Sequence, residues 1–132
     1  NQININMNDN KLMNRAADNI RILAASMVEK ANSGHPGGAM GGADFVNVLF
    51  SEFLVYDPEN PAWEGRDRFF LDPGHMSPML YSQLALAGKF TLDELKEFRQ
   101  WDSPTPGHPK ILPAHSAKAI LSQWVQLSQL NS

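Results

Sequence analysis

The chain has 132 residues, a hydrophobic content of 42% and a formal net charge of −3. This length suits a single domain with a buried core, and the mild acidic excess argues against a nucleic-acid partner. The absence of cysteine excludes disulfides, thiolate metal sites and cysteine nucleophiles. No apolar run approaches the length of a membrane span, and the polar segment Asn1–Asn6 is unlike a secretory signal. We therefore expect a soluble, cytoplasmic protein that contacts neither nucleic acid nor membrane.

A first helix is predicted over residues 11–32, after an Asn-rich stretch, 1–10, that we expect to be a flexible arm. Apolar residues recur in this helix at steps of three or four, which places them on one face. These residues are Leu12, Ala16, Ile20, Leu23, Met27 and Ala31. The following segment, Ser33–Gly38, contains a proline and three glycines, and we expect these to prevent a helix there.

A second helix is predicted from about Gly42 to Tyr56, and apolar residues on nearly all its sides indicate deep burial. The short apolar segment Arg68–Leu71 is bounded by turn residues and is typical of a buried strand. Helices that alternate with a strand favour a layered α/β architecture. One strand is too few for a complete sheet.

Two further helices have recognisable starts. Ser77–Pro78 places a capping hydroxyl before a proline, which predicts a helix that runs to about Ala87. Thr91 and Glu94 have the spacing of a capping box, which predicts a short helix reaching about Trp101. An extended, proline-rich loop follows, and the last segment, 110–132, has the pattern of one more helix.

Three of the four histidines share a local pattern, because each directly follows a glycine at a predicted element boundary. They are His35 after Gly34, His75 after Gly74, and His108 after Gly107. Glycine permits a close approach of the backbone to a ligand, and imidazoles titrate near neutral pH. The pattern therefore indicates a polar site, although a histidine in a loop is most often a solvated surface residue.

A zinc site is the alternative for three imidazoles, since neutral histidine is a good zinc ligand. The separations of 40 and 33 residues match no compact zinc motif. We therefore assign no metal-ligating residue in this chain. The glycine cluster is not a phosphate-binding fingerprint either, because it lacks the Lys-Ser/Thr ending and no predicted strand leads into it.

In chain order, these segments resemble the N-terminal part of transketolase from about Leu12 to Pro109. The resemblance is carried by an ordered set of short motifs, which is far more specific than any one of them. The motifs are Ser33–Gly37, Arg66–Phe69, Pro73–Ser77, Phe98–Gln100 and Thr105–Pro109. The resemblance implies an incomplete, helix-rich N-terminal portion of an α/β domain with a parallel sheet, which binds thiamine diphosphate. This portion spans residues 11–109.

The resemblance also implies a function. Transketolases move a two-carbon ketol unit between sugar phosphates in the pentose phosphate pathway, and they act as homodimers with Mg²⁺ or Ca²⁺. Residue by residue, it implies that His35 and His108 are catalytic and bind the substrate. His75 and Gly74 would contact the cofactor.

The chain departs from the family at two places. Pro73 stands where the family usually has asparagine, and the metal-binding Gly-Asp-Gly that follows in the family does not occur here. We therefore interpret 110–132 as a divergent tail, and one hypothesis is a shift of reading frame just after Pro109. The neighbouring frame of a possible back-translation is similar to the family's cofactor loop, so the gene's nucleotide sequence would test the hypothesis.

Alternatives to transketolase activity remain open at this point. One is a related thiamine diphosphate enzyme, such as dihydroxyacetone synthase or one subunit of a split transketolase. Another is a non-catalytic, truncated fragment. Under the transketolase interpretation, we expect the chain to be inactive alone, because the metal motif and the domain that holds the cofactor's pyrimidine ring are missing from it.

Overall fold

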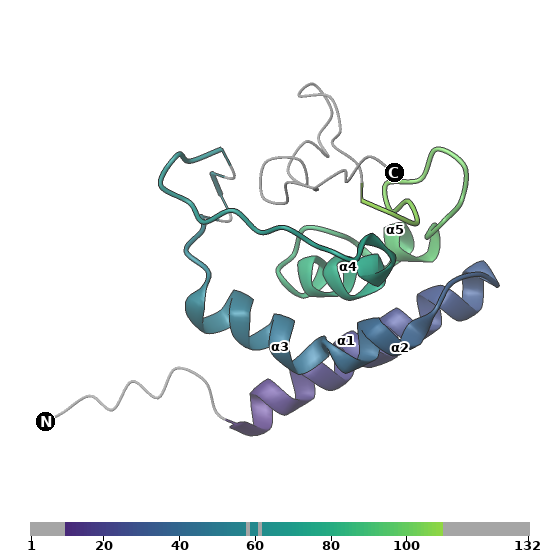
Figure 1. Ribbon diagram of the computed structural model, residues 1–132, viewed down its shortest axis with the longest axis horizontal. Coiled ribbons are helices and arrows are strands. Elements are labelled where there is room, and N and C mark those ends of the chain that lie inside the picture. The colour runs from purple at the N-terminus through teal and green to yellow at the C-terminus, as the bar shows by residue number, and fades with distance from the viewer. Residues whose placement is uncertain (1–9, 58, 61, 110–132) are drawn as a thin grey trace, which may run out of the picture.

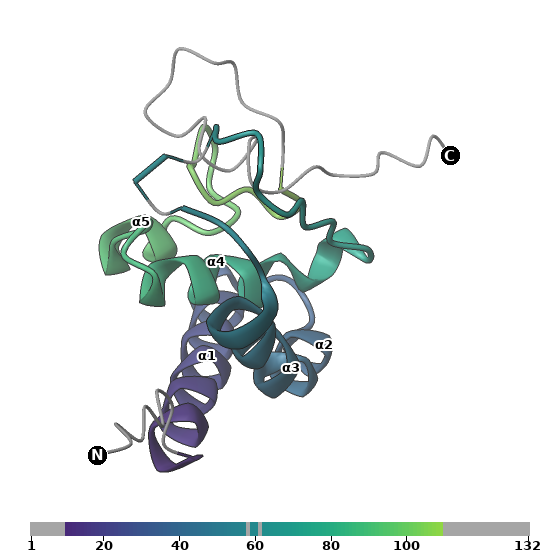
Figure 2. The same cartoon turned by 90° about the vertical axis from the view of Figure 1, so that its left-hand side faces the viewer.

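The structure is a computed structural model that describes residues 10–57, 59–60 and 62–109 (Figure 1). Its elements, in chain order, are α1 (Asn10–Ala31), α2 (Pro36–Gly41), α3 (Ala43–Val48), the π-helix η1 (Leu49–Phe53), the 3₁₀ turn η2 (Gly74–Met76), α4 (Ser77–Leu86) and α5 (Leu92–Lys96). Helix α1 contacts all four other α-helices. Helices α2 and α3 lie alongside α1, and α4 crosses it (Figure 2).

The predicted first helix is confirmed, and its buried stripe forms one side of the core. Ile20, Ala24 and Met27 are buried together with Leu80 and Leu84 of α4. The helix ends because Asn32 adopts a left-handed conformation with a φ of 48°, which asparagine tolerates better than most residues. The N-terminal part of the predicted face is more open, since Leu12 is exposed.

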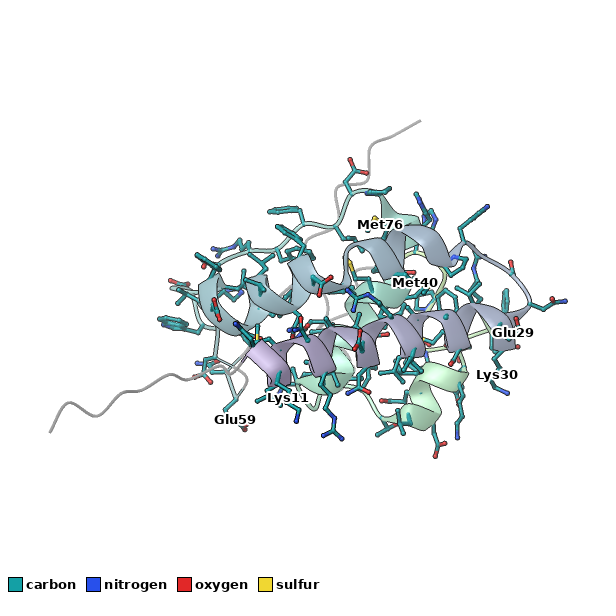
Figure 3. The ribbon with its side chains drawn as sticks, turned by 90° about the horizontal axis from the view of Figure 1, so that it is seen from below. Lys11, Glu29, Lys30, Met40, Glu59 and Met76 are labelled. Atoms are coloured by element: carbon teal, nitrogen blue, oxygen red, sulfur yellow. The ribbon has the colours of Figure 1, made fainter. Side chains whose placement is uncertain are left out.

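The expectation that residues 33–38 contain no helix is wrong for their second half. Helix α2 begins at Pro36, which occupies the first helical position. Proline is well suited there because its fixed φ is close to helical and its missing N–H would have no helical partner. Gly38 in this helix serves a purpose, since a Cβ on it would lie 3.0 Å from Cγ of Met76. Met76 lies beside α2 (Figure 3), so α2 packs closely against the segment before α4.

The predicted second helix is divided and less buried than expected. It consists of α3 and η1, in which the Leu54 N–H donates to the Leu49 carbonyl at 2.7 Å across five residues. Val46 and Phe50 face the core, whereas Phe45 is 67% and Phe53 is 68% exposed. Apolar residues on all sides predict burial only if other elements cover every side, and the described residues cover one.

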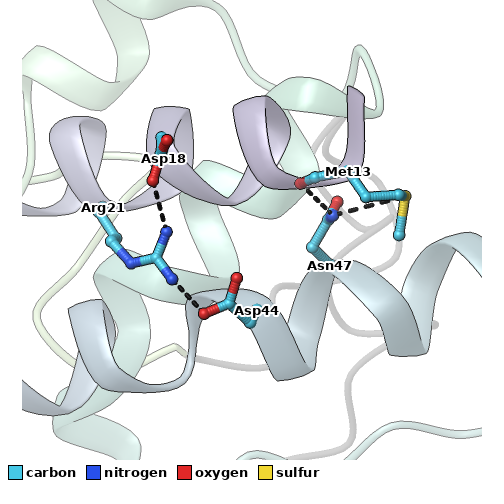
Figure 4. Close-up of polar contacts among 5 residues, drawn as sticks. All are labelled: Met13, Asp18, Arg21, Asp44 and Asn47. Atoms are coloured by element: carbon cyan, nitrogen blue, oxygen red, sulfur yellow. Dashed lines mark hydrogen bonds and ion pairs between the residues drawn. The ribbon is translucent and has the colours of Figure 1, made fainter. Parts of the chain in front are cut away.

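Polar contacts fix α3 against α1 (Figure 4). The Arg21 guanidinium donates to Asp18 at 2.7 Å, within α1, and forms an ion pair with Asp44 of α3. The side-chain amide of Asn47, which is buried, donates to the Met13 carbonyl at 3.1 Å. This buried amide donor is therefore satisfied by the backbone of α1.

The strand predicted at Arg68–Leu71 is wrong. Phe69 forms an isolated bridge, and no strand occurs among the residues that the structure describes. Leu71 is buried, but Phe70 is 53% exposed. A strand requires a neighbouring strand to pair with its backbone, and the described part of the chain offers none. The residues that the structure describes therefore form helices and loops, and the α/β architecture expected from the sequence is not seen in them.

The helices predicted to begin at Ser77–Pro78 and at Thr91 are both confirmed, with one corrected detail for each. Helix α4 begins at Ser77, but the Ser77 hydroxyl caps no backbone group of α4. The capping box of Thr91 and Glu94 is formed on both sides, and α5 ends at Lys96 rather than near Trp101. No helix in the described ranges is long and apolar enough to cross a membrane. Asn10, the last residue of the arm expected at 1–10, already belongs to α1. Residues 1–9 and the tail at 110–132 lie outside the described residues, so these two segments remain predictions.

Candidate functional site

The first histidine lies in the sharp turn between α1 and α2. Gly34 has a φ of 115°, a conformation that side chains rarely permit, and His35 returns to extended backbone with a φ of −125°. His35 is the residue directly before α2, and its side chain is exposed. The glycine therefore reverses the chain, so that the imidazole is presented at the start of α2.

The second histidine lies in η2, directly before α4. The ring centroids of His75 and His35 are 6.5 Å apart, and the two rings meet edge to face at 77°. These residues are 40 positions apart in the sequence. The packing of Met76 against Gly38 explains this closeness, because it holds η2 against α2.

The third histidine packs on the glycine that precedes the second. A Cβ placed on Gly74 would lie 3.3 Å from Nδ1 and 3.4 Å from Cγ of His108. Because His75 directly follows Gly74, the His108 ring lies next to the residue that carries the His75 ring. The structure therefore brings His35, Gly74, His75 and His108 together, a convergence that their spacing in the sequence left open.

Helix α4 holds the loop that carries His108, Thr105–Pro109, in place through two hydroxyl groups. We call this segment the third loop. The Ser77 hydroxyl donates to the Gly107 carbonyl at 2.5 Å, and the Tyr81 hydroxyl donates to the Pro106 carbonyl at 2.7 Å. Burial raises the pKa of Tyr81 above its ordinary value, so this hydroxyl keeps its proton. Sequence reasoning missed both residues as supports of the site; the available clue was two hydroxyls about one turn apart on a mostly apolar helix.

This arrangement can bind and protonate oxygen atoms of a ligand. The contacts described above fix the backbone that carries the three imidazoles. The rings of His35, His75 and His108 are exposed. A neutral imidazole offers one donor and one acceptor, and it exchanges protons near neutral pH. A phosphorylated or hydroxylated ligand is therefore a chemically suitable occupant.

The three histidines do not form the zinc site considered above. Among residues 10–57, 59–60 and 62–109, no group of three His, Cys, Asp or Glu side chains could hold a metal ion. The fourth histidine, His115, lies outside the described residues. The described part of the chain therefore supplies imidazoles without a metal-ligand set.

Helices arranged in this way, with three exposed imidazoles in the loops between and after them, form part of a domain that is suited to binding a polar ligand. Comparison with known families identifies that domain: residues 12–120 match the family model described as transketolase, thiamine diphosphate binding domain. The chain belongs to the transketolase family, whose members are transferases.

Individual relatives agree with this assignment. Transketolase 2 from Escherichia coli is 54% identical over 96 residues, which cover 72% of this chain and 14% of that protein. The chloroplastic transketolase-1 of Arabidopsis thaliana is 48% identical over 104 residues, covering 77% of this chain and 14% of that one. The crystal structure of transketolase from Campylobacter jejuni superposes with a TM-score of 0.73 at 48% identity, covering 79% of this chain and 16% of that chain. The chain thus spans about one seventh of the length of these relatives.

Proposed function

We propose that this chain contributes three of its four histidines, His35, His75 and His108, to a transketolase-type site, which transfers a two-carbon ketol unit between sugar phosphates. The observation that carries this proposal is the convergence of His35, His75 and His108 around Gly74, in a chain of the transketolase family. The names of the relatives favour this activity over that of a related thiamine diphosphate enzyme.

In this proposal, His35 and His108 bind oxygen atoms of the sugar phosphate and move protons to or from them. His75 and Gly74 would hold the diphosphate of the cofactor, and the imidazole would supply an N–H donor for a phosphate oxygen. The absent Cβ of Gly74 leaves the room that His108 occupies. Thiamine diphosphate supplies the group that carries the two-carbon unit. A positioned imidazole contributes roughly 100- to 10,000-fold to a proton transfer.

A divalent cation, Mg²⁺ or Ca²⁺, belongs to the same proposal, but not to the residues described. These form no group able to hold a metal, so any ligands for it come from elsewhere, and we derive no step through it. The described residues therefore suit thiamine diphosphate itself, through their exposed imidazoles, and not its metal ion.

The wider assembly is also proposed rather than observed. We propose that α1–α5 form a helical layer of an α/β domain and that the complete enzyme is a homodimer. The fold proposal is supported by large apolar side chains that the described residues leave uncovered, among them Phe45, Phe53 and Phe70. A cytoplasmic location stays a prediction, because one relative is chloroplastic.

The proposal is tested in a chimaera in which residues 12–109 replace their counterpart in Escherichia coli transketolase 2. We expect the chimaera to transfer ketol units. His35→Ala and His108→Ala should each lower kcat/KM by about 100- to 10,000-fold. His75→Ala should instead raise the thiamine diphosphate concentration needed for half-maximal rate. Arg15→Ala is the matched control, since Arg15 is exposed about four turns of α1 before the histidine loops.

Two outcomes would contradict the proposal. One is a folded chimaera, verified by its circular dichroism and its oligomeric state, that is inactive with all three histidines present. The other is an active chimaera whose rate is unchanged by alanine at His35 or His108.

A further inference from the structure

We propose that Arg99 is a positioning residue that joins the loop carrying His35 to the loop carrying His108. It thereby sets the relative position of two imidazoles that are 73 residues apart in the sequence. The purpose of this positioning rests on the proposed function. The structural evidence for it is the set of contacts that Arg99 makes.

The backbone of Arg99 makes an unusual turn just after α5. Its φ is 63°, a left-handed conformation that few residues other than glycine adopt. The Arg99 N–H donates to the Thr105 carbonyl at 3.1 Å, and the Thr105 hydroxyl donates to the Glu94 carbonyl at 2.9 Å. These bonds fasten both ends of the loop over 99–105 to each other and to α5.

The guanidinium of Arg99 touches the residues that precede two of the histidines. Its NH1 group donates to the Ser33 hydroxyl at 2.8 Å, and a Cβ on Gly34 would lie 3.5 Å from the same nitrogen. On the other side, a Cβ on Gly107 would lie only 2.7 Å from Nε. The guanidinium therefore occupies the space beside Gly107 that any side chain there would need.

The buried ring of Phe98 supports the guanidinium. Its centroid is 5.8 Å from Cζ of Arg99, within the range of a cation–π contact. In the described residues, then, Arg99 contacts a hydroxyl, two glycines and a ring. A surface cation that merely solubilises the chain would not need glycine at position 107, where a Cβ would lie 2.7 Å from Nε.

Lysine could not perform this role. Its ammonium is a compact point charge, whereas the planar guanidinium has a fixed fork of donors. One end of this fork reaches Ser33 while Nε and NH2 lie against Gly107. Charge alone therefore does not account for the contacts, and Arg99→Lys separates positioning from electrostatics.

The test uses the full 132-residue chain, labelled for NMR, as the natural sequence and as Arg99→Lys. One readout is amide hydrogen exchange at Gly34, His35, Gly107 and His108. The second is the nuclear Overhauser effect between the His108 ring and the α-protons of Gly74, which are in contact. We expect the exchange rates of these four amides to rise about tenfold. Such a rise corresponds to the free energy that is typically lost with a charge-assisted hydrogen bond. The Overhauser effect should weaken in parallel.

Two further variants separate positioning from general damage. Lys96→Met is the matched control, since Lys96 is an exposed cation on α5 whose ion pair with Asp93, at 3.1 Å, stays within the helix. It should leave the four amides unchanged. Ser33→Ala removes one contact of Arg99 and should raise exchange at Gly34 and His35 but not at Gly107 and His108.

The proposal is overturned if Arg99→Lys leaves the exchange rates and the Overhauser effect unchanged. It is also overturned if exchange at the core residues Ile20 and Leu80 rises as much as at the loops, because Arg99 would then support the fold in general. Neither readout requires catalysis. An inactive chimaera would thus refute the proposed function but not the positioning role of Arg99. A negative result in the NMR test would refute only the positioning role.

Discussion

Gly74 shows how one missing side chain shapes the candidate site. The His108 ring packs directly against Gly74, and its Nδ1 lies 3.3 Å from an ideal Cβ, slightly closer than a side chain there would allow. Gly74 is not among the residues with a positive φ, so the need for glycine at this position is a need for space. The identity of residue 74 therefore controls where an imidazole lies, rather than how the backbone turns.

Gly74→Ala should displace the His108 ring with little loss of stability. The ring must give way by a few tenths of an ångström, and we expect the free energy of unfolding to change by less than about 1 kcal/mol. NMR signals of the His108 ring should shift, and in the chimaera kcat/KM should fall. Gly37→Ala is the control, because a Cβ there meets nothing within 4 Å. Equal ring shifts in the two variants would contradict this account.

Tyr81 links the pH dependence of stability to the third loop. Burial raises its pKa above the ordinary value of 10.0, so the folded chain retains a proton that the unfolded chain loses. The contribution of Tyr81 to stability should therefore be constant below that value and should decline as the pH rises above it. Burial also raises the pKa of Tyr56, which adds to the same decline.

Tyr81→Phe should lower stability by about 1 kcal/mol at neutral pH, because the Pro106 carbonyl loses its donor. The same variant should show a shallower decline above the ordinary tyrosine pKa of 10.0, since one titrating group is gone. Urea unfolding at a series of pH values measures both effects. An unchanged alkaline decline would mean that Tyr81 does not carry this linkage.

At the scale of elements, α5 depends on its cap more than on its length. It has five residues, too few to be stable on local propensity alone. The Glu94 N–H donates to the Thr91 hydroxyl at 3.2 Å, and the Thr91 N–H donates to the Glu94 carboxylate at 3.0 Å. Since the turn that contains Arg99 follows α5, the cap also supports that turn.

Thr91→Ala should destabilise the chain by about 1 kcal/mol, the usual cost of losing an N-cap. Thr91→Ser retains the hydroxyl and should cost only a few tenths of that. Thermal unfolding compares the two, and hydrogen exchange at Arg99 shows whether the damage reaches the following turn. Similar losses for both variants would indicate that the hydroxyl is not the important group.

For the whole molecule, the core lies where α4 crosses α1, and the site depends on that crossing. Leu80 is completely buried in it. Leu80→Ala should cost about 2–5 kcal/mol through lost contacts and a cavity, a large part of the stability of a small domain. Leu92→Ala is the control, because Leu92 is 61% exposed. Chemical denaturation measures both, and comparable losses would place the core elsewhere.

Cofactor binding is also a property of the whole molecule. A polypeptide of these 132 residues contains no Gly-Asp-Gly metal motif. We therefore expect calorimetry with thiamine diphosphate and Mg²⁺ to show that this chain alone does not bind with micromolar affinity. The binding free energy should be smaller in magnitude than about 8 kcal/mol. Micromolar binding would refute this expectation and would locate the metal ligands among residues that lack the motif.

Local signals in the sequence were reliable where the structure depends on local bonds. The period of α1 and the capping box at Thr91 and Glu94 both predicted elements that are present. Burial of Phe45 and pairing of the segment around Phe69 depend on partners from elsewhere, and there the predictions were wrong. The histidines were identified by their glycine neighbours. Their convergence depends on how α2 and α4 pack, which spacing does not encode.

The hydroxyl contacts of α4 have a consequence for how this family can vary. Ser77 and Tyr81 hold the third loop by its carbonyl oxygens, at Gly107 and Pro106, rather than by its side chains. Every amino acid has a carbonyl, so these two bonds place no demand on the side chain at position 106. A mutational scan should therefore tolerate more substitutions at Pro106 than at Tyr81. Selection for the position of this loop would therefore act on Tyr81 in α4, 25 residues earlier in the chain than Pro106.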